Sequence, residues 1–333
     1  MKIKSIVLLI AILSTSLVKA QDPIFTQYFM IPETLNPGFT GFLETTNMGV
    51  IHRTQWPDLN FRVDSDYAFV NTWFEDANSG LGVSFLSHRE NFTNYDFKQF
   101  NVNYAYRVEL NDEWYFRPGI EVGFGNKSYG FQNIILEDQI NIGAGTINTS
   151  SVDPLLLNNR VQFFDVSAGM LFNTENAWFG ASLKHLTKPN ISYTVLGNLP
   201  LEMFMSLSGG YKFALPDGLE SSFLPRDTKM LVTGNFMKQG DFNRLDIGSE
   251  LIFNKIYFGV TAALDSMKNT SNSHFMTSIN AFGGLQYDRF KFGYSYDFNT
   301  SQIGKTGGIY ELSVTYQFDL KVKCFGCPNY NTD

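Results

Sequence analysis

Apolar and polar residues alternate along most of the chain with a period of two. The last alternating segment separates completely into two kinds of position. Its apolar positions are Tyr310, Leu312, Val314, Tyr316 and Phe318, and its polar positions are Glu311, Ser313, Thr315, Gln317 and Asp319. A helix would instead repeat its apolar residues every three or four positions. The pattern therefore predicts a β-strand with one apolar face and one polar face.

The same alternation occurs in about fourteen segments of the chain. They are centred near Val50, Ala68, Val83, Val102, Ile120, Val166, Ala181, Met205, Val232, Gly248, Val260, Ile279, Tyr294 and Val314. Their polar faces carry Gly, Ser, Asn and charges of both signs, which suits a crowded polar lumen. An even number of strands is typical of bacterial outer-membrane barrels. We therefore expect an all-β fold, a transmembrane antiparallel β-barrel; a secreted soluble β-sandwich, which also alternates, is an alternative.

The connections between these segments differ in length on the two sides of the predicted barrel. The short connections on one side are residues 111–112, 173–176, 254–255 and 287–288. The long connections on the other side are residues 126–160, 187–199, 265–273 and 299–306. Two connections depart from this division, a long one at 214–226 and a short one at 238–241. Short periplasmic turns and long external loops are typical of such barrels, so we expect the first strand to begin on the periplasmic side.

The first twenty residues have the layout of a cleavable export signal. Lys2 and Lys4 precede an apolar stretch at 6–17, and Ala20 ends the segment with a small residue. The apolar stretch is shorter than the ~20 residues of a membrane-spanning helix, although an uncleaved anchor is the alternative. We expect four regions. They are a signal peptide at 1–20, a pre-barrel segment at 21–46, an outer-membrane β-barrel at 47–319 and a short periplasmic tail at 320–333.

Composition agrees with an exported barrel and excludes several functions. Among the 333 residues, 16% are aromatic and only 17% are charged, a combination unusual for a soluble domain. The net charge of −7 argues against a nucleic acid partner. The sequence has no HExxH, GxSxG or P-loop motif, and no GxGxxG at a strand-to-helix turn. We therefore expect that the protein is not an enzyme and binds no cofactor and no metal.

The pre-barrel segment is rich in aromatic residues and prolines, so it is predicted to be extended and irregular. Two interpretations are open. The segment either tucks into the barrel or seals its periplasmic mouth, which hides apolar surface from water, or it is a docking surface for a partner protein. The candidate partner-binding residues are Asp22, Pro23, Phe25, Gln27, Tyr28, Asn36, Pro37 and Phe39.

Charged residues also occur on the predicted lumen face. They are Arg107, Arg117, Glu121, Asp165, Lys184, Lys212, Asp246, Glu250, Lys291 and Glu311. A salt-bridge network that rigidifies the barrel is the expected role, and ion selection in a channel is the sharper alternative. The four histidines, His52, His88, His185 and His274, are expected to be ordinary polar residues at strand ends.

The two cysteines, Cys324 and Cys327, lie close together in the tail. An oxidised periplasm favours a local disulfide between them. A redox pair lacks the βαβ context of thioredoxin-like motifs, and a zinc site lacks a nearby histidine.

Both ends of the chain resemble the PorP/SprF family, outer-membrane proteins of type IX secretion and gliding in Bacteroidetes-type bacteria. The N-terminal resemblance lies in Gln21-Asp22-Pro23, Phe25-Thr26-Gln27-Tyr28 and Leu35-Asn36-Pro37-Gly38-Phe39-Thr40-Gly41. The C-terminal resemblance lies in Gly307-Gly308-Ile309-Tyr310-Glu311 and Lys323-Cys324-Phe325-Gly326-Cys327-Pro328. Gly38 and Thr40 replace alanines of the family motif, and Pro328-Asn329-Tyr330 replaces its usual Pro-Arg-Phe ending.

The resemblance implies a function without catalysis. Family members assist the export or surface retention of large adhesins, or work with periplasmic ring proteins of the secretion machine. The expected partners are a secreted surface adhesin with a type IX C-terminal signal, periplasmic secretion-ring or peptidoglycan-binding proteins, and outer-membrane lipid. The alternative function is a passive porin or a fatty-acid-transporter-like carrier of hydrophobic compounds.

Overall fold

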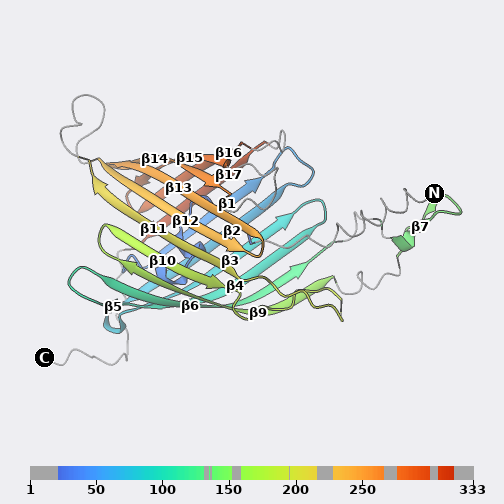
Figure 1. The fold of residues 1–333 in the computed structure, drawn as a ribbon, viewed down its shortest axis with the longest axis horizontal. Coiled ribbons are helices and arrows are strands. Elements are labelled where there is room, and N and C mark those ends of the chain that lie inside the picture. The colour runs from blue at the N-terminus through green and yellow to red at the C-terminus, as the bar shows by residue number, and fades with distance from the viewer. Residues whose placement is uncertain are drawn as a thin grey trace.

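A closed barrel of fourteen antiparallel strands forms the body of the computed structural model (Figure 1). The structure describes residues 22–130, 135, 137–151, 159–194, 196–215, 228–265, 276–300 and 307–318. The barrel strands are β1 (Asn47–Gln55), β2 (Val63–Phe74), β3 (Ser79–Glu90), β4 (Tyr95–Tyr106), β6 (Tyr115–Ser128), β9 (Arg160–Asn173), β10 (Ala177–Lys184), β11 (Phe204–Ala214), β12 (Lys229–Gln239), β13 (Phe242–Phe253), β14 (Ile256–Leu264), β15 (Met276–Tyr287), β16 (Phe290–Asn299) and β17 (Ile309–Gln317). Each strand pairs with the next, and β17 pairs with β1 to close the ring. The predicted fold class and all fourteen predicted strand positions are confirmed.

Several short elements accompany the barrel. They are β5 (Val108–Glu109), β7 (Ile140–Asn141), β8 (Thr146–Ile147) and the 3-10 helices η2 (Pro32–Thr34), η3 (Pro37–Phe39), η4 (Glu75–Ala77) and η6 (Glu137–Gln139). β7 and β8 form a separate two-stranded sheet. Within the described ranges, no helix combines the length and the apolar character needed to cross a membrane.

The two faces of the barrel wall are the reverse of those of a soluble sheet. On β4, Phe100 and Val102 are 50% and 43% exposed on the outer face, whereas Asn101 and Asn103 are each only 5% exposed on the inner face. The same inversion continues on β17, where Leu312 is outward and Ser313 is fully buried. An outer belt of apolar and aromatic residues around a polar interior is the surface that a lipid bilayer covers. The predicted division into lipid and lumen faces is therefore confirmed.

The two ends of the barrel differ in most of their connections, as predicted, and the two predicted departures, the long connection from β11 to β12 and the short one from β12 to β13, are also found. Tight turns join β13 to β14 and β15 to β16, and each turn places one residue, Asn254 or Asp288, at positive φ. We call this end the short-turn mouth; it also holds the end of β17 and the start of β1. The opposite end, the long-loop mouth, holds the connections that follow β1, β3, β6, β10, β12, β14 and β16.

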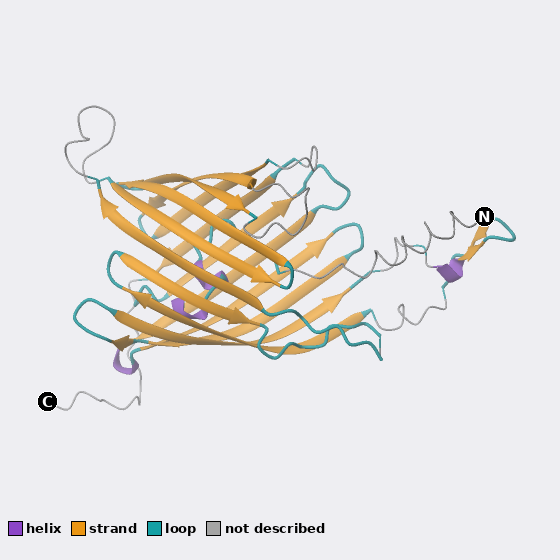
Figure 2. Ribbon diagram, in the orientation of Figure 1, coloured by secondary structure: helices purple, strands orange, loops and turns teal. Residues whose placement is uncertain are grey.

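Residues 22–46, which we call the plug, lie inside the barrel. Figure 2 shows η2 and η3 within the ring of strands, and η3 packs against β4, β6 and β9. Of the two positions that the sequence allows for an apolar pre-barrel segment, burial within the barrel is the one observed. The plug starts beside the ends of β10 and β12 at the long-loop mouth and reaches the start of β1 at the short-turn mouth.

Candidate functional site

The contact between plug and barrel wall contains a buried ionic cluster. The backbone N–H groups of Thr26 and Gln27 each donate to one carboxylate oxygen of Glu311, over 2.8 and 2.9 Å. Arg53 of β1 donates to the same carboxylate over 2.5 Å and lies 3.9 Å from a carboxylate oxygen of Asp297. The hydroxyl of Thr26 donates to Asp297 over 3.0 Å. The two carboxylates and one guanidinium thus join β1, β16 and β17 to the plug.

Each charged group of this cluster depends on the others for stabilisation, because the cluster is almost completely removed from water. The side chains of Arg53, Asp297 and Glu311 are 6%, 2% and 0% exposed. A buried charge is tolerated only where counter-charges and hydrogen bonds replace its hydration. The plug supplies part of that replacement through its backbone. Loss of the plug from its place would therefore leave Glu311 incompletely bonded.

A second charged cluster lies between the middle of β9 and the long-loop mouth at β12. The Nδ1 and Nε2 atoms of His185 lie 2.6 Å from carboxylate oxygens of Asp165 and Asp22, respectively. Burial disfavours the charged imidazolium, but the two carboxylates outweigh this effect and raise the pKa of His185 to about 9. Burial also opposes ionisation of Asp22, but His185, Lys184 and Lys127 outweigh it and lower the pKa of the carboxyl. We call Asp22, His185 and Asp165 the His185 clamp.

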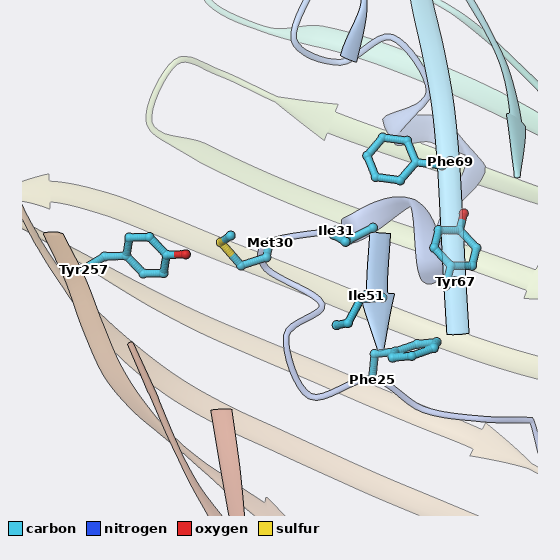
Figure 3. Packing of buried hydrophobic residues seen from close by; sticks show 7 residues of the cluster. All are labelled: Phe25, Met30, Ile31, Ile51, Tyr67, Phe69 and Tyr257. Carbon is cyan, nitrogen blue, oxygen red and sulfur yellow. The ribbon is translucent and has the colours of Figure 1, made fainter. Parts of the chain in front are cut away.

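Apolar side chains of the plug pack against the barrel wall between these clusters. Figure 3 shows Phe25 beside Ile51 of β1, and Met30 between Ile31 and Tyr257 of β14. Tyr67 and Phe69 of β2 complete the same cluster. Phe25 and Tyr67 are in ring contact, with centroids 6.3 Å apart. On the opposite wall, the Tyr28 hydroxyl shares a 3.3 Å hydrogen bond with that of Thr233 on β12.

The second half of the plug is held by a close fit to glycines. Asn36 caps η3 by accepting from the Gly38 N–H over 2.8 Å, and its amide donates to the carbonyls of Met170 and Ala181. A Cβ atom at Gly119 would lie 2.5 Å from the Gly38 nitrogen, which no real Cβ tolerates. A Cβ atom added to Gly38 would lie 2.9 Å from the Arg117 carbonyl oxygen, so this position also requires a glycine.

Two carboxylates of the plug also reach the wall near the short-turn mouth. Glu33 accepts from the Asn71 amide over 2.9 Å, and burial raises the pKa of Glu33 to about 7. Glu44 accepts from Arg107 and Arg117, and the Arg117 contact is 2.7 Å long. The Arg117 guanidinium also lies 5.2 Å from the centre of the Trp73 ring. The plug is therefore bonded at both mouths and in the middle of the lumen.

The structure places all eight predicted partner-binding residues in the plug. Phe25, Gln27, Tyr28, Asn36, Pro37 and Phe39 are buried against the wall, whereas Asp22 and Pro23 are half-buried at the long-loop mouth. In this arrangement their contacts are with the barrel itself. Their role in binding a partner stays a prediction. The two cysteines of the tail lie outside the described residues, as do the leader and His274.

The lumen charges face inward as predicted, but their ion pairs are with residues that the prediction left out. Arg117, Glu121, Asp165, Asp246, Glu250 and Glu311 are buried, and Arg107, Lys184, Lys212 and Lys291 are half-buried. The observed partners are Arg53 for Glu311, Arg244 for Asp246, His185 for Asp165 and Glu44 for both Arg107 and Arg117. Arg53 and Glu44 lie on segments whose polar pattern gives no sign of a partner across the barrel.

The expectation that every histidine is an ordinary polar residue is wrong for His185. This side chain is only 3% exposed and bonds two carboxylates, one of which comes from a residue 163 positions away in the sequence. His52 does lie exposed on the outer face, where it pairs with Asp66. No sequence pattern distinguishes the two histidines, because the partner of His185 is brought to it by the route of the plug.

Together, the apolar outer belt, the polar interior and the internal plug define an outer-membrane β-barrel protein. The family described as "Type IX secretion system membrane protein PorP/SprF" matches residues 17–316. The chain therefore belongs to the PorP/SprF family, whose members are outer-membrane components of the type IX secretion system. The resemblance inferred from the two ends of the sequence is confirmed, as is the location in the outer membrane.

Similar solved structures are also outer-membrane barrels. A "TodX deltaS2S3 mutant monoaromatic hydrocarbon channel" is 8% identical, with a TM-score of 0.50, covering 86% of this chain and 93% of that chain. Omp33 of Acinetobacter baumannii is 7% identical, with a TM-score of 0.44, covering 83% of this chain and 99% of that one. At such identities the likeness concerns the fold alone. No curated protein matches the chain.

Proposed function

We propose that this protein is a plugged docking platform, which acts as the export partner or surface anchor of a large adhesin carrying a type IX C-terminal signal. It works through protein contacts at the two mouths of the barrel, and it neither conducts solutes nor catalyses a reaction. Membership of the PorP/SprF family supports a role in type IX secretion. The finer assignment to an adhesin rests on the resemblance at both ends of the chain.

The observation that carries this proposal is the way the plug is bonded to opposite walls of the lumen. Glu311 and Arg53 hold the plug on the side of β17 and β1. Thr233 of β12 and Asn71 of β2 also contact the plug, and these two strands lie on opposite sides of the barrel. Such a segment crosses the lumen from wall to wall. Bonds to several strands at once give such a platform a rigid interior.

The two mouths suit two kinds of partner. At the long-loop mouth, Asp22 and Pro23 are half-buried beside the external connections, within reach of a protein on the cell surface. At the short-turn mouth, the plug ends beside the turns that face the periplasm, where a secretion-ring or peptidoglycan-binding protein would dock. The remaining predicted docking residues act in this scheme by holding the plug in place.

Surface display of adhesins tests the proposed function. Each protein with a type IX C-terminal signal would be quantified on intact cells of a strain lacking this gene, with and without the natural chain supplied in trans. We expect at least one adhesin to disappear from the surface and to return on complementation. If every adhesin and cell gliding stayed unchanged, the proposal would be wrong.

A measurement of solute uptake distinguishes the proposed docking platform from the alternative function, a carrier of hydrophobic compounds. The same two strains would be compared for uptake of small aromatic hydrocarbons and long-chain fatty acids. The proposal expects equal uptake, because the plug occupies the lumen. Lower uptake in the deletion strain, with adhesins still displayed, would favour the carrier.

A further inference from the structure

The His185 clamp has a geometry that suits a doubly protonated histidine between two ionised carboxylates. Both ring nitrogens lie 2.6 Å from carboxylate oxygens, and the ring is 3% exposed. A neutral imidazole carries one N–H and can donate to one carboxylate, whereas the imidazolium donates to both. Asp165 is further fixed by the hydroxyl of Thr187, which donates to its other oxygen over 3.1 Å. The wall therefore offers an oriented cation to a carboxylate of the plug.

The position of this cluster along the barrel is equally specific. His185 directly follows the last residue of β10, and Gln239, which accepts from the Asp22 N–H over 2.8 Å, ends β12. The end of β12 belongs to the long-loop mouth, whereas the end of β10 pairs with the middle of β9, so His185 lies deeper in the wall. Lys127, near the end of β6 at the same mouth, adds positive charge toward Asp22. Two hydrogen bonds and three cationic groups thus hold the first described residue of the plug at this mouth.

The other end of the plug lies at the opposite mouth. Thr46 immediately precedes β1, its hydroxyl shares a 2.7 Å hydrogen bond with that of Thr72, and its carbonyl accepts from the Phe318 N–H. Thr72 lies near the end of β2, beside the turn to β3, and Phe318 follows β17. Between these ends, contacts with Glu311, Asn71 and Gly80 follow one another along the chain. The plug therefore runs through the whole lumen.

We propose that the His185 clamp is a carboxylate-binding site whose resident ligand is the Asp22 side chain, and that it presents the amino-terminal end of the plug on the external side of the outer membrane. The ligand is a carboxylate of the chain itself. The site is assembled only when the plug has passed through the barrel, because residues 165 and 185 belong to the wall and residue 22 to the plug. This inference is independent of which partner the protein serves.

The division of the connections gives the direction. Long loops of outer-membrane barrels face the outside of the cell, and short turns face the periplasm. Asp22 is at the long-loop mouth, whereas Leu43, which is 49% exposed, lies three residues before Thr46 at the short-turn mouth. A segment that precedes the first strand of a barrel would ordinarily stay on the side where that strand begins. Here it ends on the opposite side of the membrane.

Cysteine labelling in intact cells tests both parts of this proposal. The full chain would carry Cys324→Ser and Cys327→Ser, with either Pro23→Cys or Leu43→Cys as the single probe. Cells would be treated with a membrane-impermeant maleimide before and after the outer membrane is permeabilised. We expect Pro23→Cys to react in intact cells and Leu43→Cys to react only after permeabilisation. The reverse pattern would overturn the proposed direction.

The clamp is tested by the rate of the same reaction. Asp22→Ala removes the ligand but leaves His185 paired with Asp165, so the barrel keeps its wall intact. Loss of a charge-assisted hydrogen bond corresponds to a rise in the labelling rate at residue 23 of about tenfold or more. His185→Gln is the second variant, and His52→Gln, which alters an exposed His–Asp pair on the outer face, is the matched control.

The outcomes of this comparison are distinct. The proposal expects faster labelling with Asp22→Ala and His185→Gln, and an unchanged rate with His52→Gln. An unchanged rate in all three variants would overturn the clamp, even if the direction of the plug held. Heat modifiability of the barrel on gels identifies any variant that fails to fold, and Asp22→Asn, which keeps the size of the side chain, then replaces it.

Discussion

The two halves of the plug are held in the barrel by different physical means. Residues 22–31 are bonded through charge, by the His185 clamp and by the cluster of Arg53, Glu311 and Asp297. Residues 32–46 are held through the carboxylates of Glu33 and Glu44 and also by shape, because Asn36 and its neighbours pass so close to Gly119 that no side chain fits between. Charged contacts depend on pH and on counter-charges, whereas a close fit depends on volume. Both halves therefore contain contacts that depend on charge, the His185 clamp in the first half and the contacts of Glu33 and Glu44 in the second. The close fit at Gly119, by contrast, is independent of charge.

The largest effect is expected from Arg53→Met. This change leaves Glu311 and Asp297, which are 0% and 2% exposed, without their counter-charge on β1. Removing one partner of a buried ion pair costs roughly 3–5 kcal/mol. The measurement is the urea midpoint of unfolding in detergent micelles, combined with the slope of the transition.

Arg62→Met is the matched control for this change. Arg62 also pairs with an aspartate, Asp64, but its side chain is 45% exposed. Exposed pairs contribute about 0–1 kcal/mol, so the control should unfold close to the natural protein. Equal losses in the two variants would contradict a special role for the buried cluster. Adding Glu311→Gln to Arg53→Met should recover part of the lost stability.

The His185 clamp predicts a pH dependence of intermediate size. Because the pKa of His185 is raised from its ordinary 6.5 to about 9, its contribution is fully present below pH 6.5 and is lost as pH rises through 9. The natural protein should exceed Asp22→Ala by about 1.5–3 kcal/mol at pH 6, the range of hydrogen bonds to charged groups. Unfolding by urea at pH 6 and at pH 10 measures both values.

Glu33 needs a separate control in this experiment. Burial raises its pKa from 4.5 to about 7, so ionisation of Glu33 also weakens the fold as pH rises from 4.5 through 7. Measurements in a Glu33→Gln background remove that component. A difference between Asp22→Ala and its parent that stayed constant from pH 6 to pH 10 would contradict the clamp.

The smallest effect is expected from Gly119→Ala in the second half of the plug. Its Cβ atom would lie 2.5 Å from the Gly38 nitrogen and 2.6 Å from the Pro37 carbonyl carbon, so the plug backbone must move. Overpacking of this kind costs about 1–3 kcal/mol and should be independent of pH. Gly234→Ala is the control, because the nearest atom to its added Cβ lies 4.0 Å away. A pH-dependent loss, or equal effects at both glycines, would remove the contrast between the two halves.

The barrel could be predicted from the sequence because the alternation within each strand reflects the lipid on one face and the polar lumen on the other. Lipid on one side and a polar lumen on the other give residues such as Phe100 and Asn101 opposite requirements at adjacent positions. The tight turns at Asn254 and Asp288 were equally predictable, since a short connection between two alternating segments leaves few alternatives. Local rules therefore suffice for the wall.

The plug contacts could not be predicted in the same way. Arg53 and Glu311 are brought together by the pairing of the last strand with the first, and Asp22 reaches His185 only because the plug runs through the lumen. Neither relation has a local signature. The aromatic and proline-rich composition of residues 21–46 left burial in the barrel and docking to a partner both open, and it gave neither the direction of the segment nor its contacts. The sequence also contained no sign that residue 119 must be glycine to let the plug pass, because glycine is common wherever a sheet is strongly curved.

Gly38 takes part in the same close fit. The Gly38 Cα lies against the wall at Gly119, and a methyl group would also meet the Leu171 side chain at 3.1 Å. Leu171 is fully buried and cannot turn away into solvent.

Conductance across a planar lipid bilayer tests the central claim, that the plug converts this barrel from a pore into a platform. The purified natural chain would be compared with a variant lacking residues 22–44, at the same protein concentration and in the same lipid. The account predicts no steady ion conductance for the natural chain and open-channel conductance for the variant. Steady conductance of the natural chain at the level of the variant would contradict it.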